Sequence, residues 1–152
     1  MKAVVQRVKN TSLSVEGKLI SSIDFGLVVY FCAEQDDSAE IDKKIDLLAK
    51  KIANLRIFED ENGKMNLSVL DVKGQIPAVS QFTLCGDVRH GNRPSFITAM
   101  APDMAKEGYS AFCAALRTHG AEVKEGIFGA DMQVSLVNDG PVTILLDSKK
   151  SY

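Results

Sequence analysis

Short apolar stretches, some alternating with polar residues, fill the first part of the chain. Residues 1–9 predict a strand, and residues 12–15 alternate as a strand with one buried face would. A Glu-Gly turn then leads into a further strand at 19–23. Residues 25–31 are continuously apolar, which is typical of a strand covered on both faces. The pattern therefore predicts a series of strands joined by short turns.

Two later segments carry apolar residues at helical spacing. In the first, Asp37 followed by Glu40 matches a capping box, and the apolar stripe consists of Ile41, Ile45, Leu48, Ile52 and Leu55. In the second, Pro102 stands at a first helical position and Gly120 marks the end, with a stripe of Met104, Ala105, Tyr109, Phe112, Ala115 and Leu116. Both segments predict helices with one buried face.

The other apolar segments predict more strands. Asn62 and Gly63 form a strong hairpin turn signal, and strands are expected at 76–84, 122–124, 132–137 and 142–146. Strands outnumber helices, and hairpin-length turns join several of them, which does not match a regular βαβ alternation. The expected fold is α/β in the α+β sense, in one domain over residues 1–152. We expect a mostly antiparallel, curved, barrel-like sheet with two helices packed outside it.

Composition narrows the class of protein. The chain has 152 residues, of which 45% are hydrophobic and 25% charged, as in ordinary globular domains. The net charge of -2 argues against broad electrostatic binding to nucleic acid, but allows a grip on an RNA end through a few contacts. No apolar run reaches the ~20 residues of a membrane span, and Gln6 and Arg7 interrupt the start, so no signal peptide is expected. Three cysteines without paired spacing fit a reducing compartment, and we expect a cytoplasmic location.

Familiar catalytic and cofactor motifs are absent from the sequence. His90 and His119 lie far apart and in no zinc spacing, and there is no phosphate-binding loop or nucleophile elbow, so neither a metal nor a cofactor is expected. Cys85 follows a polar segment and could act as a nucleophile, but no base is visible near it. His90 lies in a polar loop with Arg89 and Arg93, where it is either merely exposed or lines a site.

A polar insert interrupts the apolar strand at 76–84. Strand alternation would place Ser80 and Phe82 on one face and Gln81 and Thr83 on the other. One interpretation is a strand with a wet face. The other is a recognition strand whose main chain and hydroxyl groups bind a small polar ligand.

Gly140 and Pro141 interrupt a second pair of β-forming runs. Strand interiors seldom hold these residues, because proline lacks the ladder donor and glycine weakens the strand. The step is either a plain turn, or glycine allows close approach of a ligand and proline holds a cis peptide that aims two carbonyl oxygens the same way.

Taken together, these motifs resemble the D-aminoacyl-tRNA deacylases, also known as the D-Tyr-tRNA deacylase family. The similarity runs through nearly the whole chain in order and spacing. The matching segments are Gln6-Arg7-Val8, Arg56-Ile57-Phe58, Gly63-Lys64-Met65-Asn66-Leu67, Ser80-Gln81-Phe82-Thr83-Leu84, Arg93-Pro94-Ser95-Phe96, Asp131-Met132-Gln133-Val134-Ser135-Leu136 and Asn138-Asp139-Gly140-Pro141-Val142-Thr143.

The resemblance implies hydrolysis of the ester between a D-amino acid and the 3′-terminal adenosine of tRNA, without a cofactor, by a homodimer with active sites at the subunit interface. It implies a catalytic pocket lined by Ser80, Gln81, Phe82 and Thr83. It also implies that a cis Gly140-Pro141 step reaches into the partner's pocket and rejects L-amino acids, and that Arg7 helps to fix that loop. Met132 and Asn138 complete the substrate-binding residues expected on this basis.

The sequence leaves three interpretations of the function open, two catalytic mechanisms and one binding role. In the first, the adenosine 2′-hydroxyl helps to activate water, and backbone N–H groups near Phe82 and Thr83 stabilise the oxyanion. In the second, Thr83 is the nucleophile, although the sequence offers no nearby base. In the third, the protein is a binding module without catalysis. A pocket blind to the side chain would also accept glycyl-tRNA. Lys149 and Lys150 could meet the acceptor stem or form a frayed tail.

Overall fold

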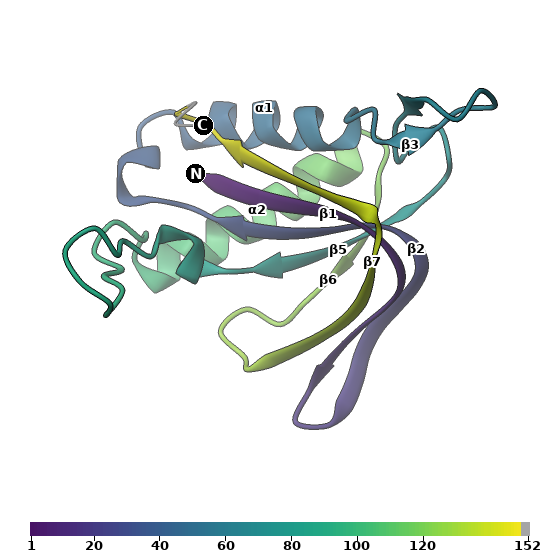
Figure 1. Ribbon diagram of the computed structural model, residues 1–152. Helices are drawn as coiled ribbons and strands as arrows, with labels where there is room; N and C mark the ends of the chain where they lie inside the picture. The colour runs from purple at the N-terminus through teal and green to yellow at the C-terminus, as the bar shows by residue number, and fades with distance from the viewer. Residues whose placement is uncertain (150–152) are drawn as a thin grey trace.

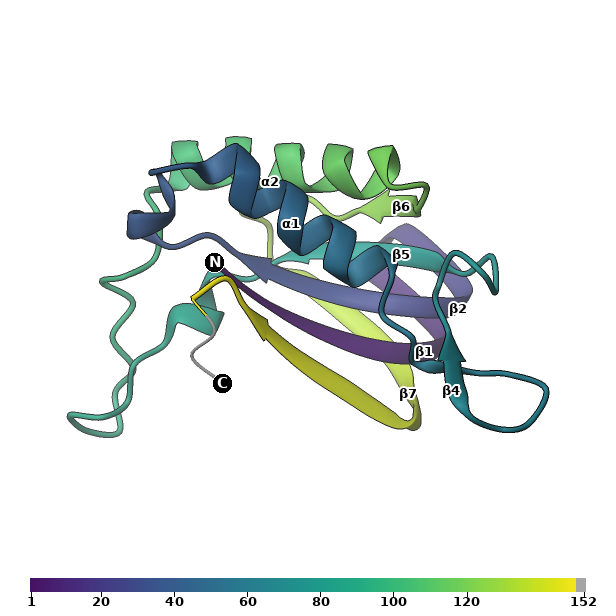
Figure 2. The ribbon, with the colours of Figure 1, turned by 90° about the horizontal axis from the view of Figure 1, so that it is seen from above.

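The computed structural model describes residues 1–149, and its centre is a curled five-stranded sheet with two helices on one face (Figures 1 and 2). The sheet order is β6-β5-β2-β1-β7. The strands are β1 (Lys2–Val15), β2 (Lys18–Cys32), β5 (Gln75–Ser80), β6 (Glu122–Glu125) and β7 (Met132–Asp147). The expected fold class, a curved sheet with two outer helices, is confirmed. The sheet curls without closing into a barrel.

Strand pairing is antiparallel in the longer strands and parallel in the shorter ones. β1 pairs antiparallel with both β2 and β7, and these long ladders make up most of the pairing. β5 pairs parallel with β2 and with β6. Parallel neighbours need long crossovers, and each crossover here contains one of the two helices. Two βαβ-like units are therefore present, although the sequence pattern did not suggest them.

The first two strands form one long hairpin instead of four short strands. Glu16 and Gly17 turn the chain with φ values of +50° and +74°, which is the backbone that tight hairpin turns need. Asn10 also has a positive φ of +50°, beside an irregularity in the pairing of β1 with β7. Asn10, which seemed to end the first strand, thus lies at an irregularity within it.

The helices are α1 (Ile41–Ala53) and α2 (Pro102–Thr118). α2 begins at Pro102 as predicted. The expected cap of α1 is wrong: the helix begins after Glu40, which has a left-handed φ of +61°, and no side chain caps it. Asp37 instead lies in a 3-10 turn, η1 (Gln35–Asp37), where its carboxylate pairs with the amino group of Met1.

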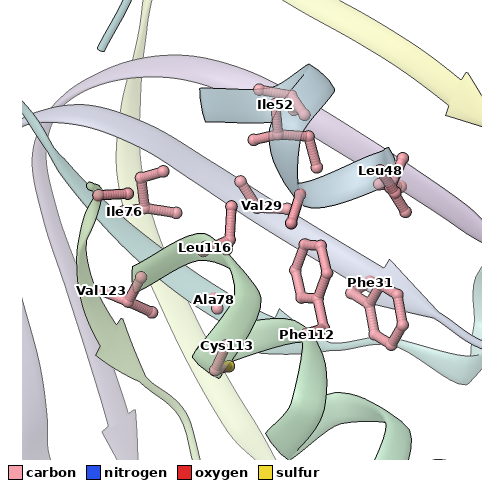
Figure 3. Packing of buried hydrophobic residues seen from close by; sticks show 14 of the residues in the cluster. Val29, Phe31, Leu48, Ile52, Ile76, Ala78, Phe112, Cys113, Leu116 and Val123 are labelled. Atoms are coloured by element: carbon pink, nitrogen blue, oxygen red, sulfur yellow. The ribbon is translucent and has the colours of Figure 1, made fainter. Parts of the chain in front are cut away.

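The main hydrophobic core lies between the sheet and the helices (Figure 3). Phe31 of β2 stacks on Phe112 of α2, with ring centroids 4.3 Å apart and planes 8° from parallel. Ile52 of α1 and Leu116 of α2 are fully buried beside them. Each such side chain contributes about 1.5–3 kcal/mol through burial. Ile76 and Ala78 of β5 belong to the same core, which therefore fixes the position of the strand that leads to the polar insert.

A smaller cluster lies on sheet residues outside the main core. Its buried members are Val8, Leu13, Ile23, Val28 and Val79, and Met132 packs against them. Val28 lies between Leu27 and Val29 of the main core along β2, so strand alternation points it to the other face. The sheet is therefore apolar on both faces along β2.

Two smaller features agree with the sequence or refine it. β3 (Phe58–Glu59) and β4 (Met65–Leu67) form the predicted hairpin, with Gly63 in its turn at φ +71°. Lys149 is not frayed, because its ammonium group contacts Glu34 at 3.2 Å and Asp36 at 2.8 Å, whereas Lys150 lies outside the described residues. No helix within residues 1–149 has the length and apolar character that crossing a membrane requires.

Candidate active site

The polar insert begins where β5 ends. β5 stops at Ser80, and the next residues form a 3-10 turn, η2 (Phe82–Cys85). The strand predicted as far as residue 84 is therefore wrong beyond Ser80, and so is the alternation of its side chains. The reason is that β2, the neighbour of β5, ends at Cys32. The N–H of Gln81 makes the last bond to β2, donating to the carbonyl of Phe31 at 2.7 Å.

The turn brings its polar side chains together at the surface. Gln81 Nε2 donates a hydrogen bond to Thr83 Oγ1, and the Thr83 side chain is exposed. Ser80 is half-buried at the end of β5, and its hydroxyl has no hydrogen-bond partner among residues 1–149. The residues predicted to be catalytic thus share one short segment, with a free hydroxyl at one end.

Backbone donors are available at the start of this turn. The N–H groups of Leu84 and Gly86 donate to the carbonyls of Gln81 and Thr83. The N–H groups of Phe82 and Thr83 have no such acceptor within the described part of the chain, as expected for the first residues of a helical turn. Two adjacent free N–H groups can bind an oxygen that carries developing negative charge.

Phe82 connects the turn with the loop that follows it. Its side chain is 59% exposed, and its ring meets Phe96 edge to face with centroids 5.2 Å apart. Phe96 belongs to the Arg93-Pro94-Ser95-Phe96 motif, and no role was predicted for it from the sequence. An exposed ring that a second ring holds in place offers a flat apolar face to a ligand.

The loop between η2 and α2 encloses a depression of about 320 Å³. Its lining consists of Asp87, His90, Arg93, Ser95, Ile97 and Thr98. Arg89 is occupied by Asp87, to which it donates two hydrogen bonds at 2.9 and 2.6 Å, and this pairing holds the pKa of Asp87 well below its usual range. His90 therefore lines a hollow, while Arg89 stabilises the loop.

The second candidate segment is a bulge in β7. Gln6 of β1 pairs with Thr143 and Val8 with Asn138, so the residues between these two positions of β7 lie opposite Arg7. β7 is one continuous strand rather than the two runs predicted. Gly140, at φ +107°, makes the change of direction.

The predicted cis peptide at Gly140-Pro141 is wrong in this structure. No peptide bond within residues 1–149 is cis. Trans is the lower-energy form even before proline, and a glycine with positive φ supplies the bend without isomerisation. The main-chain atoms of Gly140 and Pro141 remain at the surface, since both residues are exposed.

Arg7 lies behind the bulge and is buried. Its Nη1 donates to the carbonyl of Ile57 at 2.6 Å, and its Nε lies 3.2 Å from the Asp139 carboxylate. Asp139 also meets Lys9 at 3.0 Å. The predicted contact of Arg7 with the Gly-Pro loop is thus present. Asp139 belongs to one of the motifs quoted from the sequence but was given no role there, although an acidic residue beside Gly140 was a usable signal for a partner of Arg7.

Asn138 ties the two ends of the bulge together. Its Nδ2 donates to the carbonyls of Arg7 and Val142, each at 3.0 Å. Its Oδ1 accepts from Gln6 Nε2 at 3.5 Å and from the Thr143 hydroxyl at 3.3 Å. Asn138 is therefore in place to hold the shape of the bulge.

The two candidate segments are far apart within one chain. Ser80 of β5 pairs with Phe31 of β2, and Phe31 pairs with Ala3 of β1. The bulge of β7 lies opposite Arg7, which is also in β1. Four residues along β1 and three strand spacings across the sheet place them on the order of 20 Å apart. Figure 1 agrees: β5 runs toward the side where the N-terminus lies, and β7 bends on the other side. Met132 is at neither segment, because it packs in the smaller hydrophobic cluster.

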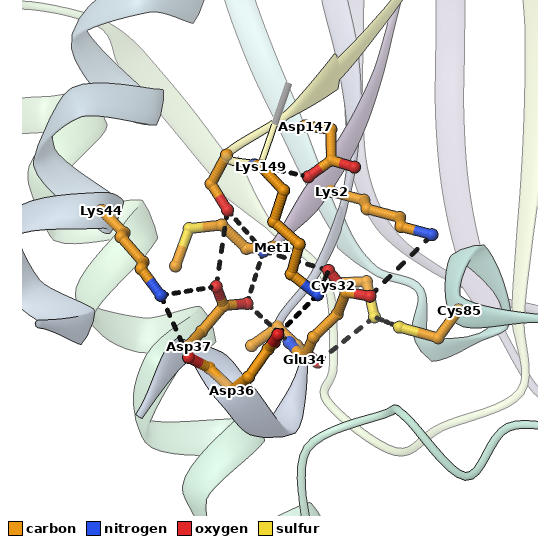
Figure 4. A network of polar contacts seen from close by, with 12 residues as sticks. Met1, Lys2, Cys32, Glu34, Asp36, Asp37, Lys44, Cys85, Asp147 and Lys149 are labelled. Atoms are coloured by element: carbon orange, nitrogen blue, oxygen red, sulfur yellow. Dashed lines mark hydrogen bonds and ion pairs between the residues drawn. The ribbon is translucent and has the colours of Figure 1, made fainter. Parts of the chain in front are cut away.

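Within residues 1–149, one acidic cluster beside the amino group of Met1 could hold a metal ion (Figure 4). Glu34, Asp36 and Asp37 hold carboxylate oxygens within 4.8 Å of one another. Ammonium groups already neutralise them: the amino group of Met1 contacts Asp37 and Glu34 at 2.5 and 3.3 Å, and Lys149 contacts Glu34 and Asp36. The cluster is therefore best explained as a tie between the N-terminal strand, η1 and the end of β7.

Comparison with known sequences places this geometry in context. Residues 4–147 match the family described as D-Tyr-tRNA(Tyr) deacylase. A protein of Thermosipho africanus named D-aminoacyl-tRNA deacylase is 55% identical over 152 residues, covering all of both chains. A protein of Koribacter versatilis with the same name is 56% identical, also over the full length of both.

Comparison with solved structures gives the same fold. The structure of a c-Myc DNA unwinding element binding protein is 45% identical with a TM-score of 0.89, over 97% of this chain and 98% of the other. A probable eukaryotic D-amino acid tRNA deacylase superposes with a TM-score of 0.80 over 95% of this chain and 97% of the other. Its 19% identity supports the fold alone.

Proposed function

The chain belongs to the D-Tyr-tRNA(Tyr) deacylase family, and from that membership we propose that it removes D-amino acids from tRNA by RNA-assisted hydrolysis at the Ser80–Thr83 turn. D-aminoacyl-tRNA deacylases are hydrolases of an ester bond, so the interpretation as a non-catalytic binding module is set aside. Water adds to the ester carbonyl carbon, the bond to the tRNA oxygen breaks, and the products are free D-amino acid and tRNA.

One observation favours RNA assistance over a protein nucleophile. Thr83 Oγ1 accepts its hydrogen bond from the amide of Gln81. An amide N–H₂ group cannot remove a proton, whereas nucleophilic catalysis by a hydroxyl needs an adjacent base. The 2′-hydroxyl of the terminal adenosine, next to the ester, is then the group that orients or activates water.

The protein's part in this mechanism is to place the ester and stabilise its charge. The free N–H groups of Phe82 and Thr83 are donors for the oxyanion, and removal of one such donor costs roughly 10²–10³-fold in rate. The Ser80 hydroxyl and the Gln81–Thr83 pair hold the ribose and the ester. The exposed ring of Phe82, supported by Phe96, is a stacking face for the terminal base.

In this proposal the β7 bulge selects D-aminoacyl over L-aminoacyl substrates. Main-chain oxygens of the Gly140–Pro141 segment, placed against the substrate α-carbon, would tolerate hydrogen there and clash with an L side chain. Such a wall must be rigid, and the contacts of Arg7 and Asn138 supply that rigidity. Exclusion by a rigid wall can exceed the ~1–3 kcal/mol discrimination that one methylene gives in a pocket. Glycyl-tRNA passes the same wall and is a second substrate.

The separation of the two segments within one chain supports a homodimer. A second copy that presents its β7 bulge to the first copy's turn would complete the pocket, and a two-fold axis would make two such pockets. Leu145 and Val137 of β7 are 53% and 54% exposed, as expected for a strand whose apolar side chains are covered by a partner. We place the reaction in the cytoplasm, where aminoacyl-tRNA is used.

Three substrates test the reaction itself. D-Tyr-tRNA should lose its amino acid, L-Tyr-tRNA should be stable, and D-Tyr-tRNA ending in 2′-deoxyadenosine should react poorly. Thr83→Ala should keep much of the activity on the normal substrate. Full-rate cleavage of the deoxy substrate would reject RNA assistance. An acyl intermediate trapped on Thr83 would establish the alternative, a threonine nucleophile.

Mixing of inactive subunits tests the shared pocket. One variant is altered at Gly140 and lacks a working β7 bulge. The other carries Gln81→Ala and Ser80→Ala and lacks a working turn. If each pocket combines halves from two subunits, half of the randomly mixed dimers carry one intact pocket of two, and about a quarter of wild-type activity returns. A pocket built within one chain predicts no recovery. Each variant alone, unfolded and refolded in the same way, is the control.

A further inference from the structure

Two cysteine sulfurs lie against each other beneath the candidate catalytic turn. Cys32 is the last residue of β2 and Cys85 the last residue of η2, and their Sγ atoms are 2.7 Å apart (Figure 4). Both are free thiols and both are buried. This separation is shorter than ordinary packing of two sulfur atoms, and a disulfide would need the two atoms to approach to 2.03–2.05 Å.

The surroundings of this pair connect it to the turn. Cys32 Sγ donates to the carbonyl of Ala33 at 3.4 Å and also lies 3.7 Å from the carbonyl of Phe82. Cys85 precedes Gly86, whose N–H donates to the carbonyl of Thr83 at 3.0 Å. A change at either sulfur is therefore transmitted directly to the main chain of residues 82–85.

We propose that Cys32 and Cys85 are a reversible dithiol–disulfide pair, and that forming the disulfide switches the deacylase off. The inference rests on the proposed function in one respect, because it takes the Ser80–Thr83 turn as the place of ester hydrolysis. The oxidant is a peroxide. One thiolate attacks a peroxide oxygen and the O–O bond breaks, which gives a sulfenic acid and, after the leaving hydroxide takes up a proton, water. The second thiol then attacks the sulfenic sulfur and displaces a second water as the S–S bond forms. The protein loses two protons and two electrons in total, and a dithiol reductant returns them.

The two sulfurs differ in a way that assigns these roles. The hydrogen bond between them raises the pKa of the Cys32 thiol, burial raises it further, and the same hydrogen bond lowers the pKa of the Cys85 thiol. Since the thiolate is the reactive form, Cys85 reacts first with peroxide and Cys32 resolves the sulfenic acid. Phe82 and Thr83 are exposed and lie in the same turn as Cys85, so the turn that holds Cys85 borders solvent.

Loss of activity follows from the change in geometry. Bond formation draws the sulfurs together by a further fraction of an ångström, and it removes the Cys32 S–H that faces the carbonyls of Ala33 and Phe82. Displacements of about 1 Å in positioning groups can cost roughly 10²-fold in rate. We therefore expect oxidised protein to deacylate D-Tyr-tRNA at least about tenfold more slowly than reduced protein.

The third cysteine is a matched internal control. Cys113 lies in α2, and burial raises the pKa of its thiol to about 12. Among the described residues, Cys32 and Cys85 form the one pair of sulfurs in contact. Cys113→Ala should therefore leave disulfide formation unchanged, whereas Cys32→Ala and Cys85→Ala should each abolish it.

The first measurement concerns the bond and needs no activity. Reduced wild-type protein and the three cysteine variants are treated with hydrogen peroxide, and non-reducing peptide mapping by mass spectrometry reports which cysteines are joined. We expect a Cys32–Cys85 crosslink, with loss of two hydrogen atoms, in wild-type protein and Cys113→Ala only. Absence of this crosslink from oxidised wild-type protein overturns the inference, whatever the activity does.

The second measurement concerns the switch. Oxidised wild-type protein should lose activity on D-Tyr-tRNA and regain it with a dithiol reductant, while Cys32→Ala should keep, after peroxide treatment, the activity that it has when reduced. A complete crosslink with unchanged activity overturns the switch but leaves the deacylase proposal standing. If fully reduced wild-type protein does not act on D-Tyr-tRNA, the proposed function fails and the switch falls with it, while the mapping result still reports on the bond.

Discussion

Gly140 lies directly against the guanidinium group of Arg7. A Cβ atom built at Gly140 would stand 2.6 Å from Arg7 Nη2, a distance that real Cβ atoms do not show, and the glycine has φ +107°. Arg7 cannot give way cheaply, because its other nitrogens hold the carbonyl of Ile57 and the carboxylate of Asp139. The bulge therefore requires glycine for two separate reasons, conformation and space.

Gly140→Ala should damage the reaction more than it damages the fold. Strain at positive φ costs about 1–2 kcal/mol, and the displaced bulge should lower deacylation of D-Tyr-tRNA by roughly 10²-fold if a shift of about 1 Å results. The measurement is kcat/KM on D-Tyr-tRNA together with the free energy of unfolding. Gly120→Ala is the matched control, because Gly120 has a similar φ of +93° and only ordinary contacts at 3.9 Å. Equal activity of the two variants would contradict the role of the bulge.

Arg7→Met should destabilise the protein far more than Lys9→Met. Both cations contact the Asp139 carboxylate, but Arg7 is buried whereas the side chain of Lys9 is 60% exposed. Loss of Arg7 leaves the buried carbonyl of Ile57 without its donor and leaves the Asp139 carboxylate with Lys9 alone, which should cost about 2–3 kcal/mol. Loss of Lys9 should cost less than about 1 kcal/mol, as for exposed pairs in general. Urea unfolding of both variants gives the comparison, and similar losses would show that burial of Arg7 is not the decisive factor.

The sequence predicts the local elements of this fold well, and its long-range pairing less well. Pro102 and the turn at Gly63 are correctly read, because their signals depend on a few neighbouring residues. The parallel pairing of β5 with β2 and β6 was missed, since it depends on contacts between distant segments. The end of β5 at Ser80 follows from the end of β2 at Cys32, which no pattern within 76–84 contains.

In the candidate site, too, local features were predicted from the sequence and features that depend on distant segments were not. The residues of the turn and the bulge were found from motifs, and the contact of Arg7 with the bulge was expected. The trans peptide at Gly140-Pro141 and the 3-10 turn at Phe82 were not, because both depend on how a strand meets its neighbour. The contact between Cys32 and Cys85 joins residues 53 positions apart, so spacing alone gave no reason to pair them.

Acid should weaken the fold through Asp37. Burial acts to raise the pKa of this carboxyl, but hydrogen bonds from the Met1 ammonium group and the Glu34 N–H outweigh it, so the pKa in the folded protein is lowered. A lowered folded pKa gives stability that is present above the unfolded value of about 3.9 and is lost as pH falls through the folded value. Unfolding free energies measured from pH 7 down to pH 3 should therefore fall steeply below about pH 4.

Asp37→Asn tests whether this group causes the loss. Breaking a buried ion pair costs about 3–5 kcal/mol, so the variant should be much less stable at pH 7 and should differ less from wild type below pH 4. Asp36→Asn removes a neighbouring carboxylate that is 66% exposed and should change stability by less than about 1 kcal/mol. A constant gap between wild type and Asp37→Asn at every pH would assign the acid sensitivity to another carboxyl.

Leu145→Glu should separate the subunits and thereby stop the reaction. Leu145 of β7 and Leu47 of α1 are 53% and 58% exposed, so each can carry a glutamate without disturbing the fold. In the proposed dimer only Leu145 is covered by the partner, where a buried unpaired charge is strongly unfavourable.

We expect light scattering to show a monomer for Leu145→Glu and a dimer for Leu47→Glu. Because the pocket would need the β7 bulge of a second copy, activity at micromolar protein should fall at least about tenfold. A folded monomer with full activity on D-Tyr-tRNA would instead mean that one chain carries the whole site, despite the separation of its turn and its bulge.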